Sequence, residues 1–222
     1  MSIQPKSKKG NRQRSTTPAP SHEAATECKM GRPREFSEEQ ALDAAMRVFW
    51  DKGYEGATLA DLTDAMGINR SSLYSSFGDK QELYRRVLDR YASGPASFMN
   101  CALEAATARE VVAKIFDGAV KALSDPHNPR GCLTVQGALA CGSESRSVQM
   151  ETVEFRRRAE QTLVQRLRRA QKEGDLRRDS DPADIAKFVV TVVNGLAVQA
   201  ANGASGKEMK RVTETAMLGL GW

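Results

Sequence analysis

The stretch from Thr58 to Lys80, TLADLTDAMGINRSSLYSSFGDK, constrains the fold more than any other part of the chain. Its apolar residues recur at helical spacing on both sides of Gly67, where a positive φ angle is cheap. We therefore predict two short helices joined by a tight turn, with Arg70 opening the second helix and Tyr74 on the same side. A helix-turn-helix has this layout and places its second helix in the major groove of DNA.

Capping and breaking signals on both sides predict further helices. Ser37 is followed by two glutamates and Gln40, the pattern of a capping box at the start of a helix that ends at Gly53. Asp79 predicts the cap of another helix, which runs to the Ser-Gly-Pro breaker at 93–95. Since the chain lacks the period-two alternation of half-buried strands, we expect an all-α protein.

The second half of the chain has the same helical character. Thr107 predicts a helix start, the segment 124–131 predicts a loop, and Asp181 followed by Pro182 predicts another start. The later helices are expected at Cys132 to Cys141, about Ser147 to Lys172, about Pro182 to Ala201 and roughly Gly206 to Leu218.

The excess positive charge is confined to the N-terminal tail. Residues 1–35 carry eight basic and three acidic residues, which accounts for the whole net charge of +5. The tail is rich in Pro, Ser and Thr, so we expect it to be disordered alone. It is interpreted either as a solubilising tail or as an arm that adds phosphate contacts. The arm is favoured, because residues 36–91 hold seven basic against ten acidic residues.

The sequence favours a cytoplasmic protein. The N-terminus has no apolar core, so it is not a secretory signal. The longest apolar run, 185–201, contains Lys187, Asn194 and Gln199, which favours a buried helix over a membrane span. The four cysteines have no CxxC spacing, as expected for reduced thiols.

Many spaced positions between Phe36 and about Tyr91 together resemble the TetR family of transcriptional regulators. The matching pieces are Ala45 to Phe49, Gly53-Tyr54, Ala57-Thr58-Leu59, Asp61-Leu62, Gly67-Ile68, Ser72-Leu73-Tyr74 and Phe77-Gly78-Asp79-Lys80. The resemblance implies a homodimer that binds a double-stranded DNA operator, and usually repression that a small molecule relieves. Neither the operator nor the effector follows from the sequence, and an activator role stays open.

This resemblance implies an N-terminal three-helix helix-turn-helix head plus a C-terminal helical ligand-binding and dimerisation domain. The expected divisions are a disordered basic arm at 1–35, a DNA-binding domain at 36–91 with the helix-turn-helix at about 58–77, and a regulatory domain at 95–222. The long helix from Ser147 and the apolar helix from Pro182 are the expected dimer helices.

The residues expected to contact DNA fall into three groups. Arg70 opens the recognition helix, where a long cation can reach a guanine edge or a phosphate. Thr58 and Lys80 stand at two other helix starts, where phosphate can bind; simple capping and surface charge is the alternative. Gly31-Arg32-Pro33-Arg34 is similar to arms that enter the minor groove. The full set is Arg32, Arg34, Thr58, Asn69, Arg70, Ser71, Tyr74, Ser75 and Lys80.

The resemblance implies an effector pocket among apolar residues of the second half, and each of these residues can equally be an ordinary core residue. We expect a mostly apolar, uncharged or weakly polar effector, with the arginine run at 156–158 on a solvated face paired with Glu. The expected lining is Ile115, Phe116, Ala119, Leu133, Val135, Phe155 and Phe188.

Cys132 offers an alternative mode of regulation. It follows Arg130-Gly131 at the start of a predicted short helix, a setting that can activate a thiol, and Cys141 could resolve its oxidised form. The Gly-Cys-Leu segment also resembles one in a subset of the family that senses electrophiles or oxidants. Thiol sensing is therefore the alternative to ligand-induced release.

An enzyme is the rival class of function. The chain has no GxGxxG, P-loop, HExxH or G-x-S-x-G motif, and His127 with Cys132 and Cys141 does not fit known zinc spacings. We therefore expect no catalytic residue, metal or cofactor. A bare dimerisation module is the other rival, but it would not need Arg70 and Tyr74 exposed on a short capped helix.

Overall fold

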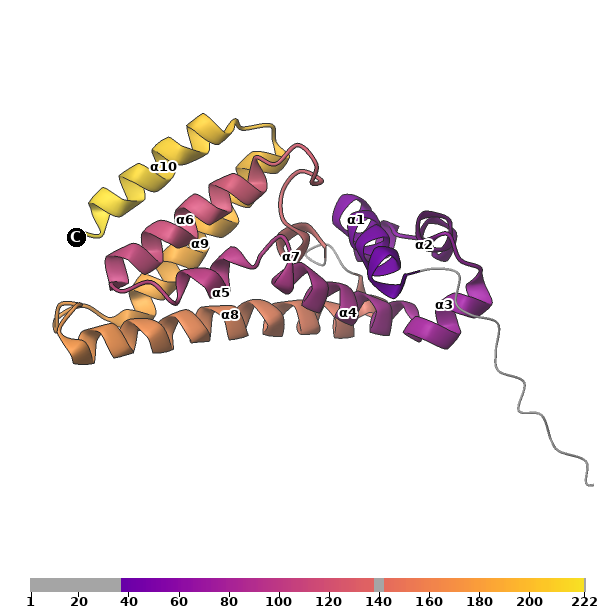
Figure 1. Ribbon diagram of the computed structural model, residues 1–222, viewed down its shortest axis with the longest axis horizontal. Helices are drawn as coiled ribbons and strands as arrows, with labels where there is room; N and C mark the ends of the chain where they lie inside the picture. Colours follow the sequence, from indigo (N-terminus) through magenta and orange to yellow (C-terminus); the bar gives the residue numbers. More distant parts are fainter. Residues whose placement is uncertain (1–36, 138–141, 222) are drawn as a thin grey trace, which may run out of the picture. The chain divides into compact units, whose positions relative to one another are not determined.

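The computed structural model describes residues 37–137 and 142–221, and in these ranges every regular element is a helix. The prediction of an all-α protein is thus confirmed (Figure 1). The α-helices are α1 (Glu38–Gly56), α2 (Leu59–Met66), α3 (Arg70–Phe77), α4 (Lys80–Ser93), α5 (Phe98–Ala102), α6 (Ala108–Leu123), α7 (Leu133–Gln136), α8 (Arg146–Glu173), α9 (Pro182–Ala201) and α10 (Gly206–Gly219), with a 3-10 turn at Ser143–Ser145.

Three of the first four helices, α1, α2 and α4, begin directly after the predicted capping residues Ser37, Thr58 and Asp79. Thr58 and Asp61 form a capping box at the start of α2, and Asp79 accepts a hydrogen bond from the Glu82 amide at the start of α4. Gly67 ends α2 in the left-handed region with φ of 65°, which is the conformation that glycine adopts without strain.

Two local predictions are wrong. Ser37 caps α1 through a long 3.5 Å hydrogen bond, without the reciprocal bond from Gln40 that the predicted capping box requires. The apolar spacing in the sequence also predicts that Ala65 shares the buried face of α2 with Leu62 and Met66, but Ala65 is exposed. The predicted stop at Gly53 is visible as a break with φ of 71°, after which one further turn completes α1.

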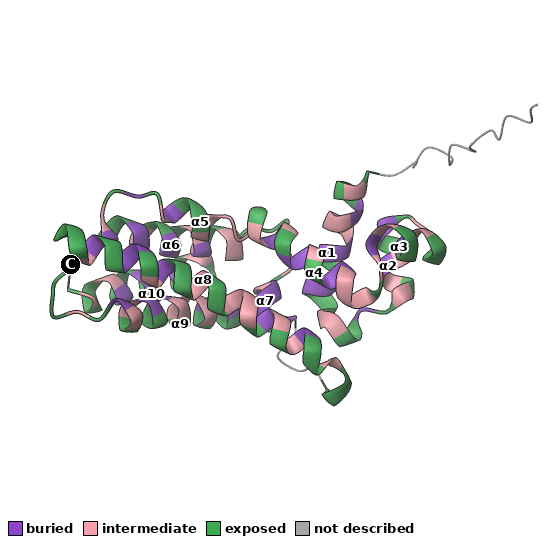
Figure 2. Ribbon diagram, turned by 90° about the horizontal axis from the view of Figure 1, so that it is seen from below, coloured by how far each residue is buried: buried purple, intermediate pink, exposed green. Residues whose placement is uncertain are grey.

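The core of the head includes residues from far along the chain. Its large buried side chains come from α1 to α4, but Leu133 and Val148 belong to the same cluster. Main-chain bonds add to this contact, since the Tyr54 amide donates to the Gly137 carbonyl at 2.8 Å. Helix α7 therefore packs against α1 and α4 of the head, and α8 packs against α4 (Figure 2).

The remaining helices enclose a second core. It is built by α5, α6, α8, α9 and α10, with side chains such as Ile115, Phe116 and Leu163 fully buried. Arg166 of α8 is 6% exposed and donates hydrogen bonds to the carbonyls of Leu103, Ala105 and Ala106. These bonds satisfy carbonyls in the connection between α5 and α6, which have no partner within a helix. Helix α5 was not predicted from the sequence.

Candidate nucleic-acid interface

The outward face of α3 is polar and has few internal contacts. Leu73 and Phe77 are buried and anchor the helix, while Asn69, Arg70, Ser71 and Ser75 are exposed. Tyr74 is 48% exposed, although it is a large aromatic residue. This face therefore presents a guanidinium, hydroxyls and an amide to any partner that reaches it.

Asn69 has a structural role that was not predicted from the sequence. Its side-chain oxygen accepts a hydrogen bond from the Ser72 amide at 2.8 Å, so Asn69 is the N-cap of α3. The side-chain NH₂ is left to donate outward, because the cap uses only the carbonyl oxygen. The pattern Asn-x-x-Ser could have revealed this cap.

Thr58 and its neighbours form a tightly bonded corner at the start of α2. Thr58 Oγ1 accepts from the Asp61 amide at 3.1 Å, and Asp61 in turn accepts from the Thr58 amide at 3.0 Å. Lys52 Nζ lies 2.6 Å from Asp61 Oδ1. The hydrogen bond from Lys52, followed by those from Thr58, lowers the pKa of Asp61 to about 2. The carboxylate is therefore charged and already paired at neutral pH.

Lys80 opens α4, and its ammonium lies 4.5 Å from the centre of the Tyr54 ring. Arg86 and Arg90 hold α4 against α1 through ion pairs with Glu38 and Asp43. Arg86 also donates to the Ser76 carbonyl at 2.9 Å, which ties the end of α3 to α4. The end of α3 is thus bonded to α4, which is itself paired with α1.

Two of the residues expected to touch DNA, Arg32 and Arg34, lie outside the described residues, as does Cys141. The other seven lie at three neighbouring places along the chain: the N-cap of α2, the N-cap and outer face of α3, and the first residue of α4. The groups of His, Cys, Asp and Glu in the described ranges include none that could hold a metal ion.

A small cavity lies between α4, α5, α7, α8 and α9. Its volume is about 90 Å³. Residues from all five helices or their caps line it: Tyr91, Ala96, Phe98, Met99, Cys132, Thr134, Phe155, Arg156, Ala159, Val190, Val193 and Asn194.

Of the expected pocket residues, only Phe155 lines this cavity. Ile115, Phe116 and Ala119 are fully or almost fully buried on α6, and Leu133 belongs to the core of the head. Val135 is buried as well, whereas Phe188 is 41% exposed on α9. Apolar periodicity identifies buried residues, but it does not distinguish the wall of a cavity from the inside of a core.

Cys132 is the N-cap of α7 and is half-buried in the cavity wall. The Tyr91 hydroxyl donates to its sulfur at 3.1 Å, and Thr134 Oγ1 lies 3.2 Å away. Burial, followed by the neighbouring thiol, raises the pKa of Tyr91 well above its ordinary value. The Tyr91 hydroxyl therefore stays protonated and links α4 to α7 across the cavity.

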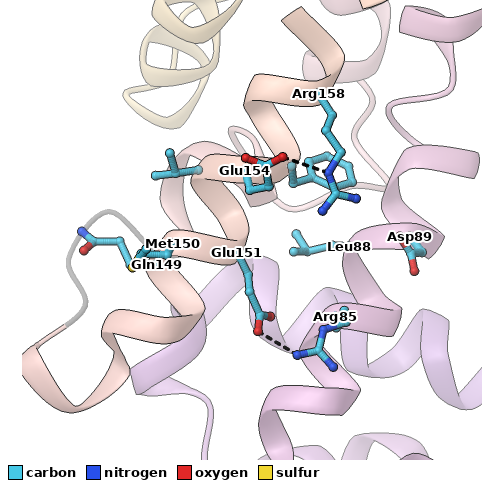
Figure 3. Close-up of a pocket in the computed structure, with 10 residues that line it drawn as sticks. Arg85, Leu88, Asp89, Gln149, Met150, Glu151, Glu154 and Arg158 are labelled. Atoms are coloured by element: carbon cyan, nitrogen blue, oxygen red, sulfur yellow. Dashed lines mark hydrogen bonds and ion pairs between the residues drawn. The ribbon is translucent and has the colours of Figure 1, made fainter. Parts of the chain in front are cut away.

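A wider groove separates α4 from the first turns of α8 on the outside (Figure 3). Its volume is about 570 Å³, and Phe155 forms part of both this groove and the inner cavity. Arg85 Nη2 and Gln81 Nε2 both donate to Glu151 Oε1, at 2.7 and 2.6 Å. These two bonds connect α4 to the long helix α8.

Known proteins of similar sequence cover both halves of the chain. The family model for bacterial regulatory proteins of the tetR family matches residues 41–87, and the model for tetracyclin repressor-like C-terminal domains matches residues 106–216. The HTH-type transcriptional repressor ComR of Escherichia coli K12 is 30% identical over 189 residues, which cover 84% of this chain and 90% of ComR. BdcR, another such repressor of this strain, is 30% identical over 79% of this chain and 84% of its own length.

One solved structure matches this chain over nearly the whole of its own length. It is a cysteine mutant of the TetR family regulator CifR complexed with 26 base pairs of double-strand operator DNA. Its sequence is 39% identical to that of this protein. The match covers 84% of this chain and 98% of the CifR chain, with a TM-score of 0.80. The matches to both family models and to repressors of similar length show that the chain belongs to the TetR family of DNA-binding transcriptional regulators.

Proposed function

We propose that the chain is a cytoplasmic, homodimeric repressor that binds an operator through α3 and releases it when a small molecule occupies the regulatory half. The observation that carries this proposal is the exposed polar face of α3, held from behind by Leu73 and Phe77. The named repressors ComR and BdcR and the operator complex of CifR support it.

In this proposal Arg70 reads bases and the surrounding residues position the helix. A guanidinium can bind two acceptors on a guanine, which is the commonest specific contact in the major groove. Asn69, Ser71, Tyr74 and Ser75 offer short or rigid polar groups for bases and phosphates. The amides at the starts of α2 and α4, with Thr58 and Lys80, hold phosphates on either side.

The proposed dimer interface uses α9 and α10. Both carry apolar side chains that are exposed in the single chain: Phe188 and Val198 on α9, Val212 and Leu218 on α10. A groove of about 370 Å³ runs between these two helices. A continuous stretch of 18 residues in α9 has a mean hydropathy of 1.3, and only 28% of that stretch is buried. A second copy of the chain would cover this surface.

The long helix α8, predicted as an interface helix, has its exposed apolar residues elsewhere. Met150 and Val153 lie on its first turns and border the groove beside α4. We therefore assign α10, rather than α8, as the partner of α9 in the dimer.

Thiol sensing remains the alternative mode of release, and the comparisons do not favour it over ligand binding. Oxidation of the sulfur would change the group that accepts the hydrogen bond from Tyr91. A Cys132→Ser variant that still responds normally to electrophiles in a reporter assay would exclude this alternative.

A DNA titration tests the proposal. Fluorescence anisotropy with DNA from upstream of the protein's own gene should give tight binding that unrelated DNA of equal length does not match. Arg70→Ala should weaken binding to the specific DNA by roughly 10- to 100-fold, the cost of one bidentate base contact. Arg168→Ala, an exposed arginine on α8, is the control and should bind normally. Equal binding of both DNAs by the unaltered protein would contradict the proposal.

A further inference from the structure

The three consecutive arginines of α8 have different surroundings. Arg157 Nε lies 2.7 Å and Arg158 Nε 3.3 Å from the carboxylate of Glu154. Residues three and four positions apart share a helix face, whereas residues two apart do not. Glu154 therefore pairs with Arg157 and Arg158, while Arg156 points to another side of α8.

Arg156 lies in the wall of the inner cavity, half-buried, and forms no ion pair or hydrogen bond with the residues that the structure describes. The other lining residues include no Asp or Glu, and several of them, such as Phe98, Phe155 and Val193, are apolar. A half-buried guanidinium without an anionic partner is costly, because apolar walls replace part of its hydration. The cavity is thus complementary to an anion.

A second polar group lies on the facing helix. Helices α8 and α9 pack against each other, and Lys187 of α9 forms an ion pair with Glu160 of α8 at 2.6 Å. This packing brings Asn194 to the same cavity as Arg156. The Asn194 side chain also forms no hydrogen bond within the described ranges. The hydroxyl of Tyr91, by contrast, already donates to Cys132.

We propose that this cavity binds a small organic carboxylate, with Arg156 gripping the carboxylate group, Asn194 donating to it and the apolar walls enclosing the rest of the ligand. The planar guanidinium matches two carboxylate oxygens through parallel N–H bonds. The proposal deepens the proposed function, on which it rests, by naming the chemical class of the effector. It replaces the expectation of an uncharged effector.

The size of the cavity limits the ligand. A cavity of about 150 Å³ accommodates benzene in a well-studied case, and this one measures about 90 Å³. A short aliphatic carboxylate fits with little change, while an aromatic carboxylate requires Phe155 or Met99 to move. Since Phe155 also borders the outer groove, its movement would open the cavity towards solvent.

Trp50 provides a spectroscopic probe for occupancy. Its ring lies 5.0 Å from that of Tyr91, in an edge-to-face arrangement, and Tyr91 lines the cavity. The chain has only one other tryptophan, Trp222. In a Trp222→Phe background, the fluorescence therefore reports on the surroundings of Trp50 alone.

The experiment titrates the full-length protein with butyrate and benzoate, each compared with its uncharged amide, butyramide or benzamide. Each pair has nearly the same shape, so a difference in affinity reports the charge. We expect at least one anion to bind saturably and at least tenfold more tightly than its amide. If neither anion, up to roughly 100 mM, binds more tightly than its amide, the proposal is overturned.

Matched variants locate the site. Arg156→Gln should weaken binding of the anion at least tenfold, and Arg156→Lys should restore part of it, since the charge returns without the planar fork. Arg157→Gln removes an identical charge from the next position and should change the affinity less than twofold. If Arg156→Gln and Arg157→Gln lose the same affinity for the anion, the effect is one of overall charge, and the proposed site is overturned.

Operator titrations of the same samples separate this proposal from the proposed function. An anion that binds through Arg156 and weakens operator binding supports both. An anion that binds through Arg156 without affecting operator affinity supports the carboxylate site and contradicts ligand-induced release. If the anions and their amides change operator binding equally, the result contradicts the carboxylate site. The proposal of a ligand-responsive repressor then still stands.

Discussion

The helix-turn-helix and the inner cavity are built from the chain in opposite ways. The recognition surface comes from one continuous stretch, residues 58–80, and its shape depends on caps and turns within that stretch. The cavity collects Tyr91, Phe98, Cys132, Arg156 and Asn194 from five separate parts of the chain. Local interactions thus define the first site, and packing between distant segments defines the second.

This difference explains why the two sites carry such different information in the sequence. A cap is a side chain that bonds to a backbone amide a few residues away, so residue type and spacing are enough to identify it. A cavity-lining residue looks like a core residue until the neighbouring helix is in place. The two sites meet at α4, which begins beside the recognition helix and ends at the cavity.

The largest predicted effect tests whether the head really depends on the second half. Leu133→Ala removes a fully buried side chain from the core of the head and should lower the free energy of unfolding by about 2–5 kcal/mol. Urea denaturation measures this change. Val153→Ala truncates an apolar side chain that is 47% exposed and lies outside the proposed dimer interface, so it is the control and should have little effect. A similarly small change for Leu133→Ala would mean that the head is independent of α7.

Deletion of residues 1–34 tests whether the local recognition surface is sufficient for DNA binding. The deleted segment carries all eight basic residues of the tail. If Arg32 and Arg34 contact DNA, the salt dependence of binding should flatten by about two units in the log–log slope, and the affinity should fall roughly tenfold or more at low salt. Anisotropy titrations at several salt concentrations give both values. An unchanged slope would assign the tail a solubilising role.

Thr58→Ala examines the capping box itself. The variant loses the bond between Thr58 Oγ1 and the Asp61 amide and should destabilise the protein by about 1 kcal/mol. Thr58→Ser keeps a hydroxyl at the cap and should recover most of this loss. Thermal unfolding followed by circular dichroism compares the three proteins. If serine recovers stability but not operator affinity, the threonine methyl group contributes to DNA contact.

The smallest predicted effect concerns pH. Because the pKa of Asp61 is lowered to about 2 in the folded state, its ionised form stabilises the fold above its ordinary pKa of 3.8. That contribution should disappear as the pH falls from about 4 to about 2. The stability difference between the unaltered protein and Asp61→Asn, measured by urea denaturation, should therefore shrink over this range. A constant difference would show that the carboxylate charge is not involved.

Much of the fold was predictable from particular residues. Thr58, Asp79, Thr107 and Asp181 all cap the helices that they were expected to cap, because each bond spans only two or three residues. The short helix α5 was not predictable, since it begins without a side-chain cap and is held by Arg166 from α8. The predicted helix at 132–141 is shorter in the described part, where α7 ends at Gln136.

In the candidate sites too, features set by local contacts were predictable from the sequence, and features set by distant packing were not. The five outward residues of the recognition helix and its cap were predicted to be exposed and are exposed, because Leu73 and Phe77 fix which face is buried. Whether these five residues contact DNA remains a prediction. Arg156 could not be distinguished from Arg157 and Arg158 in the sequence, since only the position of α9 shows which of the three meets a cavity.

The bonds between α1 and the segment 127–142 have a consequence for protein engineering. Arg47 donates to the His127 carbonyl, the Tyr54 amide donates to the Gly137 carbonyl, and Glu55 accepts from the Gly142 amide. A DNA-binding head grafted onto another regulator would leave these groups behind, along with Leu133. Chimeras of this protein should therefore be designed with the 127–142 segment and the head exchanged as one cassette, although more than thirty residues separate them in the sequence.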